Sequence, residues 1–287
     1  MKSNIKFFKK SRTLPVDEFF KNVLYDNKFG YYSSKLPFGE KGDYITAPKI
    51  SYLFSEMIAI WIITTWELFG KPKKLNIVEL GPGDGSLSNI LIKTFKKFPE
   101  FNLIKKIYLY EESGFLKKIQ KKNIADKNVK WISNFSQIKN GPVIFFGNEF
   151  FDAIPIKQFK RVKNVLFEKN YTLDKNYKIK EIFKKASASD IKVIRSYKIL
   201  RSLKFIEFPK NGLRELKKII KKISKLGLSN LLILRYRSAC LLNFIFLAII
   251  SALSIIPISS KKLFCVTTFL IFRPFFLKNS LRSAKLT

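Results

Sequence analysis

The chain has 287 residues, a formal net charge of +34 at pH 7 and no histidine. The lack of histidine excludes a Ser–His or Cys–His nucleophilic system and any His-ligated metal site, so acid–base chemistry must come from Asp, Glu, Tyr or Lys. The two cysteines, Cys240 and Cys265, form neither a metal-binding pattern nor a disulfide framework, and we expect no metal site.

The N-terminal part predicts two helices joined by a long loop. Residues 14–29 predict a short helix, because Pro15 suits a first helical turn and acidic residues follow it. Residues 51–69 predict a strongly apolar helix. Its expected buried face consists of Phe54, Met57, Ile58, Trp61, Ile62 and Thr65.

The loop between these helices is rich in turn residues and includes the run from Gly42 to Pro48. Long loops of this kind are often functional, but composition alone fits a packed surface loop equally well. The residues that we single out as candidates for contact with a substrate are Gly42, Asp43, Tyr44, Thr46 and Pro48.

The most informative stretch, residues 75–86, is an apolar strand that meets three alternating glycines and then a helical pattern. This order places Gly81, Gly83 and Gly85 at the carboxyl end of a buried strand, where α/β sheets bind nucleotide-like ligands. Glycines permit positive φ and leave space for a ligand beside the backbone. A glycine-rich turn without a ligand is the alternative.

Two carboxylates accompany these glycines, Glu79 at the strand tip and Asp84 in the turn. They would repel a pyrophosphate and suit a cationic or hydroxyl-rich ligand better. The Gly-Lys-Ser/Thr ending of a phosphate-binding loop is also missing. The stretch is therefore not a phosphate loop.

Further strands are predicted at residues 106–110, 129–132 and 142–147. Glu111 follows the first of them, and in doubly wound folds an acidic residue at the tip of the second strand binds ribose hydroxyls. A solvated acidic strand end is the other interpretation. Ser113 is expected to cap the next helix.

Asn148, Glu149 and Asp152 follow the strand at 142–147. Because the carboxyl ends of parallel strands meet at one sheet edge, this segment is expected beside the glycine turn. A substrate that reacts with a ligand on the glycine turn would have to lie there. Alternatively, the Asn and Asp of this segment cap backbone groups of a turn. Beyond it, residues 157–184 predict antiparallel strands, 204–209 one more strand, and 211–225 a basic helix.

Several of these segments together resemble one family, the MidA-type methyltransferases, whose mitochondrial branch assists assembly of respiratory complex I. The resemblance covers about residues 14–228. The matching runs are Phe29-Gly30-Tyr31-Tyr32, Gly42 to Pro48, Val78 to Leu87, Glu111-Glu112-Ser113 and Asn148 to Pro155, together with Ser51, Phe54, Glu56, Trp61, Leu116, Gln120 and Trp131.

The resemblance implies a Rossmann-like class I methyltransferase sheet, with an N-terminal helical segment and an appended antiparallel β region. It implies S-adenosylmethionine as cofactor and a protein substrate, and it points to a protein arginine and to a respiratory-complex subunit. The cofactor would lie against Glu79, Gly81, Gly83, Asp84, Gly85 and Glu111. Asn148, Glu149 and Asp152 would face the acceptor. One departure is Lys49, where the family usually has Glu, which bears on substrate recognition.

These features divide the chain into residues 1–72, 73–228 and 229–287. The last part is anomalous: no Asp or Glu follows Glu215, and residues 241–258 and 263–272 are apolar. A tail read out of frame from an A/T-rich gene would explain this composition, leaving a truncated or frame-shifted, inactive member. A membrane hairpin within 241–272 is the alternative, since 18 residues are long enough to span a bilayer.

The high charge has two interpretations. It indicates either a nucleic-acid surface or a general compositional bias toward lysine, and we favour the bias because no segment concentrates arginine with stacking aromatics. A specific nucleic-acid partner is therefore not expected. The first ten residues contain no apolar run of signal-peptide length, which predicts a cytoplasmic protein.

Overall fold

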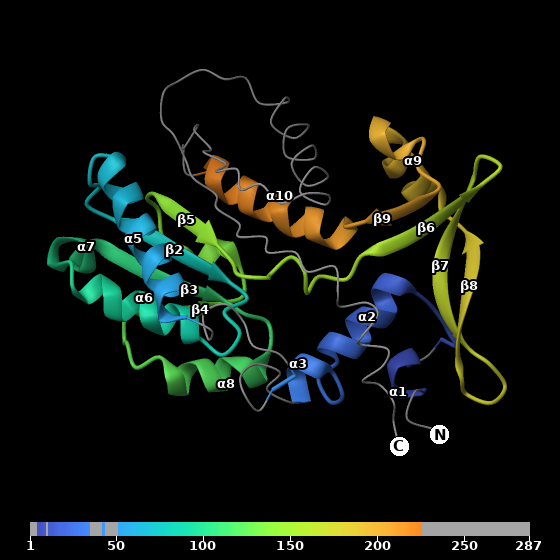
Figure 1. Cartoon of the computed structure of the whole chain (residues 1–287), viewed down its shortest axis with the longest axis horizontal. Helices are drawn as coiled ribbons and strands as arrows, with labels where there is room; N and C mark the ends of the chain where they lie inside the picture. Colours follow the sequence, from blue (N-terminus) through green and yellow to red (C-terminus); the bar gives the residue numbers. More distant parts are fainter. Residues whose placement is uncertain (1–4, 10, 35–41, 44–50, 226–287) are drawn as a thin grey trace.

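The computed structural model describes residues 5–9, 11–34, 42–43 and 51–225, and its central element is a four-stranded parallel sheet (Figure 1). The sheet order is β4-β3-β2-β5. Its strands are β2 (Leu75–Leu80), β3 (Lys105–Tyr110), β4 (Val129–Ile132) and β5 (Val143–Phe146). The chain runs outward from β2 to β4 and then returns to the other side of β2 for β5. The direction of winding reverses between β2 and β5, which is where open α/β sheets bind ligands.

Helices cover both faces of this sheet, because its strands are apolar on both sides. One face packs against α5 (Tyr52–Leu68), α6 (Ser86–Lys96) and α7 (Pro99–Ile104). The opposite face packs against α10 (Lys210–Lys225) and η2 (Phe135–Gln137). Helix α8 (Gly114–Asn123) follows β3 at the edge of the first layer. The result is a three-layer arrangement, and the loops that follow the parallel strands lie at the carboxyl edge of the sheet.

The second sheet is antiparallel, with the order β1-β7-β6-β9 and β8 paired to β7. Its strands are β1 (Thr13–Pro15), β6 (Lys157–Val162), β7 (Val165–Leu173), β8 (Ile179–Lys185) and β9 (Phe205–Phe208). A separate core cluster joins it to α9 (Ala188–Ser196) and η3 (Lys198–Leu200). Near its other end lie α1 (Ile5–Phe8) and α2 (Val16–Tyr25), which is followed by α3 (Tyr31–Ser34).

A buried ion cluster ties this second sheet to α2 and α9. The Lys157 ammonium forms an ion pair with Glu168 and lies 3.3 Å from Asp190 and 3.9 Å from Asp17. Its side chain is 11% exposed, and the three carboxylates are similarly buried. Lys210 adds a second cation, 2.7 Å from Asp190. Since Lys157 begins β6, the cluster fixes the start of this strand.

The fold predicted from the sequence, an α/β protein with an appended antiparallel region, is confirmed. The strand at 129–132 has the predicted bounds, and Ser113 caps α8 as predicted. The prediction for Met57 was wrong: its side chain is 63% exposed, whereas the neighbouring Ile58 and Ile62 are buried. Because α5 is apolar around most of its circumference, its sequence does not reveal which side is buried. Strand β1 and helices α1, α3, α7 and α9 were not predicted. Helix α3 lies where a loop was expected, and Pro15, expected in a first helical turn, ends β1 and precedes α2.

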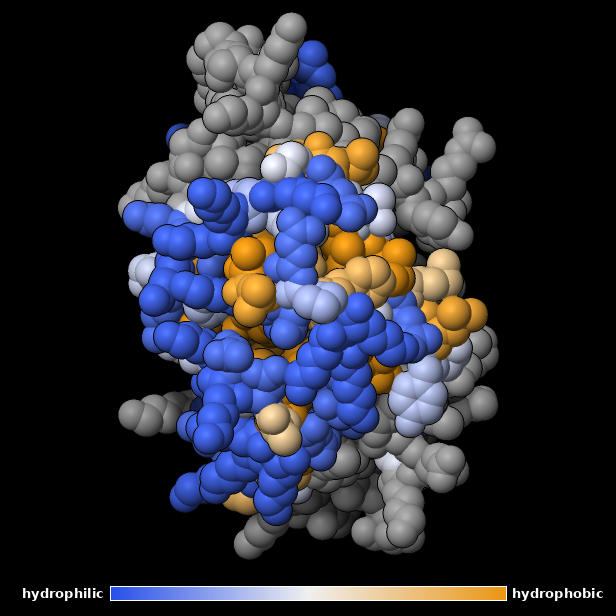
Figure 2. Space-filling view, turned by 90° about the vertical axis from the view of Figure 1, so that its left-hand side faces the viewer, coloured by the Kyte–Doolittle hydropathy of each residue, from blue (hydrophilic) through white to orange (hydrophobic). Residues whose placement is uncertain are grey.

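Figure 2 shows the side of the molecule on the left of Figure 1, where hydrophilic residues dominate and apolar ones are interspersed. Several apolar residues of α5 are exposed, among them Leu53, Met57 and Leu68. Among the helices that the structure describes, none combines the length and apolar character needed to cross a membrane. The predicted tail, residues 229–287, lies outside the described residues.

Candidate active site

The carboxyl ends of three parallel strands meet at the point where the winding reverses. Glu79 of β2 is aligned with Leu109 of β3 and with Phe146 of β5, so the loops after these strands start at the same level. The Gly81 amide donates to the Tyr110 carbonyl at 2.9 Å. The sheet therefore gathers the predicted site residues from three loops onto one edge.

The glycine turn has the left-handed backbone that the sequence predicted. Gly81, Gly83 and Gly85 have φ of 60°, 58° and 84°. A Cβ at Gly81 would lie 2.8 Å from the Phe150 ring, and a Cβ at Gly85 would lie 2.9 Å from the Ile124 side chain. At these two positions the lack of a side chain thus permits close packing within the protein. Such close packing holds the backbone of the turn in place for any ligand above it.

Glu79 lies beneath this turn and is only 2% exposed. Ser88 on α6 donates a hydrogen bond to its carboxylate. Burial raises the pKa of Glu79 to about 7; the Ser88 hydrogen bond opposes this shift, and the charges of Asp84 and Glu111 add to it. In this conformation the carboxylate connects the tip of β2 to α6. Asp84 is also buried, and its Oδ1 accepts from the Ser86 amide at 3.0 Å.

Glu111 directly follows β3 and accepts hydrogen bonds from two donors. The Ser113 amide donates to its Oε1 at 2.8 Å, and the Gln120 Nε2 donates to its Oε2 at 3.2 Å. Gln120 also donates to the Gly83 carbonyl at 2.8 Å and accepts from Trp131 Nε1 at 2.9 Å. Burial is the main cause that raises the pKa of Glu111. Gln120 therefore locks the acidic strand tip to the glycine turn.

On the other side of the reversal point lie Asn148, Glu149 and Asp152. The Phe150 ring packs against Gly81 and lies 6.2 Å from the Tyr110 ring, so the prediction that this segment lies beside the glycine turn is confirmed. Glu149 has φ 58°, a conformation that costs a glutamate energy and that clusters at functional sites. The Oδ1 atom of Asn148 is buried and accepts no hydrogen bond from the described residues.

The carboxyl group of Asp152 has a raised pKa. Although the residue as a whole is exposed, partial burial of its carboxyl group, and next the charge of Glu149, raise the pKa of Asp152 to about 6. Close to neutral pH such a carboxylate can accept a proton more readily than an ordinary aspartate. This property fits the role of a base at an acceptor site.

Only part of the predicted substrate loop is described. Gly42 and Asp43 are included, and Asp43 accepts a hydrogen bond from the Tyr31 hydroxyl at 2.5 Å. Tyr44, Thr46 and Pro48 lie outside the described residues. The Tyr31 contact connects the start of this loop to α3.

Two tyrosines of the N-terminal helices were not predicted as part of the site. The Tyr25 hydroxyl donates to the Ala153 carbonyl at 2.7 Å, and the Tyr25 ring stacks on Tyr32 at 5.4 Å between centroids. The Tyr32 carbonyl accepts from the Ser113 hydroxyl at 2.9 Å. No sequence pattern indicates the two hydrogen bonds, because their partners are 128 and 81 positions apart in the chain.

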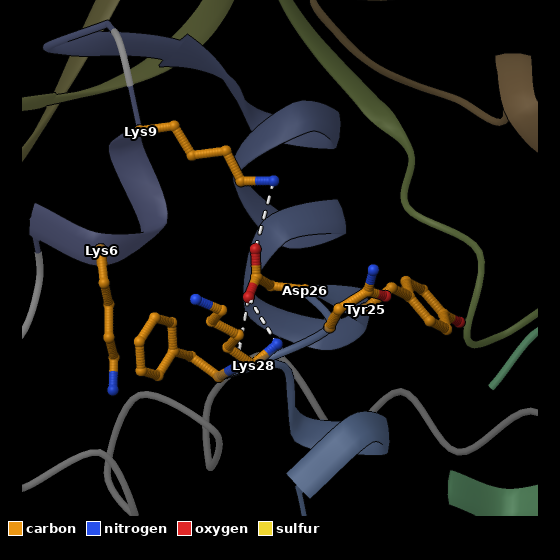
Figure 3. Close-up of a pocket in the computed structure, with 7 residues that line it drawn as sticks. Lys6, Lys9, Tyr25, Asp26 and Lys28 are labelled. Carbon is orange, nitrogen blue, oxygen red and sulfur yellow. Dashed lines mark hydrogen bonds and ion pairs between the residues drawn. The ribbon is translucent and has the colours of Figure 1, made fainter. Parts of the chain in front are cut away.

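A separate pocket of about 430 Å³ lies between α1 and the end of α2 (Figure 3). It is lined by Lys6, Lys9, Tyr25, Asp26, Asn27, Lys28 and Phe29. Asp26 is paired with Lys9 at 3.2 Å, and its Oδ1 accepts from the Lys28 and Phe29 amides. None of the predicted site residues lines this pocket. The site is therefore better defined by the strand ends than by this cavity.

The strand order and the glycine turn define a Rossmann-like enzyme of the class that binds nucleotide-type cofactors. A family model described as "Putative S-adenosyl-L-methionine-dependent methyltransferase" matches residues 57–239, and the chain belongs to this family. S-adenosylmethionine is the cofactor of this family.

Named relatives confirm the resemblance to the MidA-type methyltransferases. The protein arginine methyltransferase NDUFAF7, mitochondrial, of Xenopus laevis is 30% identical over 180 residues, which cover 54% of this chain and 41% of the relative. The human protein of the same name is 29% identical over 177 residues, with 53% and 40% covered. The chain thus spans about two fifths of the length of these relatives.

Solved structures support the fold. A Burkholderia thailandensis protein bound to S-adenosyl-homocysteine superposes with a TM-score of 0.61 at 19% identity, covering 72% of this chain and 55% of that one. A native structure from the same organism gives a TM-score of 0.58 at 18% identity, with 72% and 53% covered. The similarity extends over most of this chain.

Proposed function

We propose that this chain is an S-adenosylmethionine-dependent methyltransferase that acts on a protein arginine side chain. The observation that carries the proposal is the meeting of three strand ends, which places the glycine turn and Glu111 on one side of the reversal point and Asn148 to Asp152 on the other. The names of the curated relatives support the choice of acceptor.

The residues present fit the cofactor. Glu111 offers carboxylate oxygens for ribose hydroxyls at the tip of the second parallel strand. The first turn of α6 follows the glycine turn directly and offers backbone amides to a ligand. The buried Asn148 Oδ1, without a hydrogen-bond partner among the described residues, calls for a donor. Glu79 and Asp84 support the turn from below.

When bound, S-adenosylmethionine supplies an electrophilic methyl group on a sulfonium. The side chains of Asn148, Glu149 and Asp152 then have to orient the acceptor nitrogen toward that methyl group. A guanidinium has a delocalised positive charge and planar donors, which paired carboxylates hold in one orientation. As the nitrogen is methylated it must lose a proton. Asp152, with its raised pKa, is the group that we assign to accept it.

Cofactor binding is tested by calorimetry on the full chain with S-adenosylmethionine and S-adenosylhomocysteine. The variant Gly83→Val should abolish binding, because a β-branched residue is strained at φ 58°. Gly114→Ala is the matched control, since a Cβ there meets nothing within 4 Å. If the folded wild-type chain binds neither compound, the proposal is wrong.

Acceptor identity is tested with labelled S-adenosylmethionine and a pair of peptides that differ only in arginine or lysine at one position. Transfer to the arginine peptide alone is the expected result. Transfer to lysine alone would refute the arginine assignment while leaving the methyltransferase proposal intact. A respiratory-complex subunit as substrate and a cytoplasmic location remain proposals, to be tested by substrate capture and by cell fractionation.

The residues after 228 carry a proposal of their own, independent of the site. We propose that the acid-free tail is read out of frame. The family match includes residues 229–239, so the change of frame would begin near Cys240. Reading the coding DNA in the other two frames tests this: the proposal fails if neither frame continues the family pattern.

A further inference from the structure

We propose that Tyr25 is a positioning residue for methyl transfer, and that it acts by holding the Ala153 carbonyl and thereby the Asp152 carboxylate. The inference rests on the proposed function for its catalytic consequence. The contact itself can be tested without any activity.

The first step of the argument is the contact. The Tyr25 hydroxyl donates to the Ala153 carbonyl at 2.7 Å, and the two residues are 128 positions apart in the chain. Figure 3 shows the Tyr25 ring pointing away from Lys6, Lys9 and Lys28, out of α2. Ala153 follows Asp152 directly, so fixing this carbonyl restricts the backbone that carries the proposed base.

The second step is the rigidity of Tyr25 itself. Its ring stacks on Tyr32 at 5.4 Å, with an angle of 27° between the rings. Burial, and next the charges of Tyr32, Glu111 and Glu112, raise the pKa of Tyr25, so the phenol stays protonated and remains a donor. The hydroxyl is partly buried, so leaving it without an acceptor costs free energy.

The third step connects Tyr25 to the cofactor side. Tyr32, on which Tyr25 stacks, accepts a hydrogen bond at its carbonyl from the Ser113 hydroxyl at 2.9 Å. Ser113 caps α8, and its amide donates to Glu111. A continuous chain of contacts therefore runs from the acceptor segment at Ala153 through α2 and α3 to the acidic tip of β3. These contacts connect the loop after β5 with the loop after β3 through helices that lie outside the sheet.

The start of α2 holds the same segment at a second place. Asp17 lies 3.9 Å from the Lys157 ammonium, and Lys157 is four residues beyond Ala153. Helix α2 thus contacts the segment from 153 to 157 with both of its ends. The position of residues 153–157 therefore depends on this one short helix. Of the two contacts, the one made by Tyr25 is nearer to Asp152.

The test compares Tyr25→Phe with the wild-type full chain. The substitution keeps the ring and its stacking on Tyr32 but removes the hydroxyl. We expect kcat to fall about tenfold, because one hydrogen bond that positions the proposed base is lost, while KM for S-adenosylmethionine and the calorimetric cofactor affinity stay unchanged. Tyr197→Phe is the matched control, because Tyr197 packs on Phe208 in the appended sheet, away from the site.

A second measurement does not require turnover. Hydrogen–deuterium exchange of peptides covering residues 148–156 should be faster in Tyr25→Phe than in the wild type, and unchanged in Tyr197→Phe. Unchanged exchange in Tyr25→Phe would overturn the proposal even if the enzyme is active. An inactive wild type with faster exchange in the variant would refute the proposed function and leave the positioning contact standing. Equal losses of kcat and cofactor affinity would reduce Tyr25 to a structural residue and overturn the proposal.

Discussion

The Ser88 hydroxyl donates a hydrogen bond to the Glu79 carboxylate, and both side chains are only 2% exposed. Glu79 lies one residue before the end of β2, and Ser88 lies in the first turn of α6. The pair therefore joins strand and helix underneath the glycine turn. Glu79 should therefore contribute to the stability of the fold, and the pH dependence of unfolding measures this contribution without any cofactor.

The first prediction concerns Glu79→Gln. The folded-state pKa of about 7 lies above the unfolded value of 4.5, so the native state binds more protons between these values. The free energy of unfolding of the wild type should therefore fall by up to about 3 kcal/mol as the pH rises from 4.5 through 7. Glu79→Gln keeps an acceptor for Ser88 and does not titrate. Thermal unfolding should show that stability falls less between pH 5 and pH 8 in the variant than in the wild type. An equal fall in both proteins would contradict a buried, titrating carboxylate at Glu79.

The second prediction concerns the base. Asp152→Asn should keep cofactor affinity and lower kcat by about a hundredfold or more, as removal of a general base does. Because the base must be ionised and the pKa of Asp152 is about 6, wild-type kcat should fall as the pH drops through 6. A pH–rate profile together with calorimetry provides both readouts. If affinity and kcat fall together, Asp152 is structural.

The third prediction compares two substitutions of Glu149, which has φ 58°. Both Glu149→Gly and Glu149→Ala remove the carboxylate, but only glycine adopts this backbone without strain. The left-handed conformation costs a non-glycine residue roughly 1–2 kcal/mol, and glycine loses about 0.5–1 kcal/mol through its larger unfolded-state entropy. Urea unfolding should show the glycine variant to be the more stable one by up to about 1 kcal/mol. The opposite order would show that the backbone of residue 149 is not left-handed in solution.

The fourth prediction concerns the buried lysine of the second sheet. Lys157→Met removes the cation between Asp17, Glu168 and Asp190 and should destabilise the fold by about 3–5 kcal/mol. Asp190 keeps its ion pair with Lys210, but Asp17 and Glu168 stay buried and lose their ion pair with Lys157. Lys169→Met is the control, because its partner Glu181 is 53% exposed and such pairs contribute at most about 1 kcal/mol. Denaturant midpoints measure both. Similar losses in the two variants would show that burial adds nothing at Lys157.

The sequence predicts the parts of the site that follow from local order. The glycines after β2, Glu111 after β3 and Asn148 after β5 could be placed because each follows an apolar run, and parallel strands bring their ends together. Ser113 could be identified as a cap from its position before a helical pattern.

Other features depend on contacts that no local pattern encodes. Gln120 belongs to the residues that carry the family resemblance, but its hydrogen bonds to Glu111 and Gly83 depend on how α8 lies against the turn. The left-handed backbone of Glu149 could not be expected, because glutamate has no preference for it. The three-residue strand β1 is too short for a periodic signal and forms only because β7 offers it a free edge.

The pairing of β1 with β7 has a consequence for how the chain folds. Thr13 and Thr172 exchange a side-chain hydrogen bond across 159 positions, whereas the parallel sheet is built from strands between residues 75 and 146. Contacts between distant positions form slowly, because the loop must close before they gain any energy. During synthesis, β7 also emerges long after β1. The parallel strands can therefore pair before β7 is available, although α10 covers their second face only later. Residues 11–25 have to wait for β7 before β1 can pair with it.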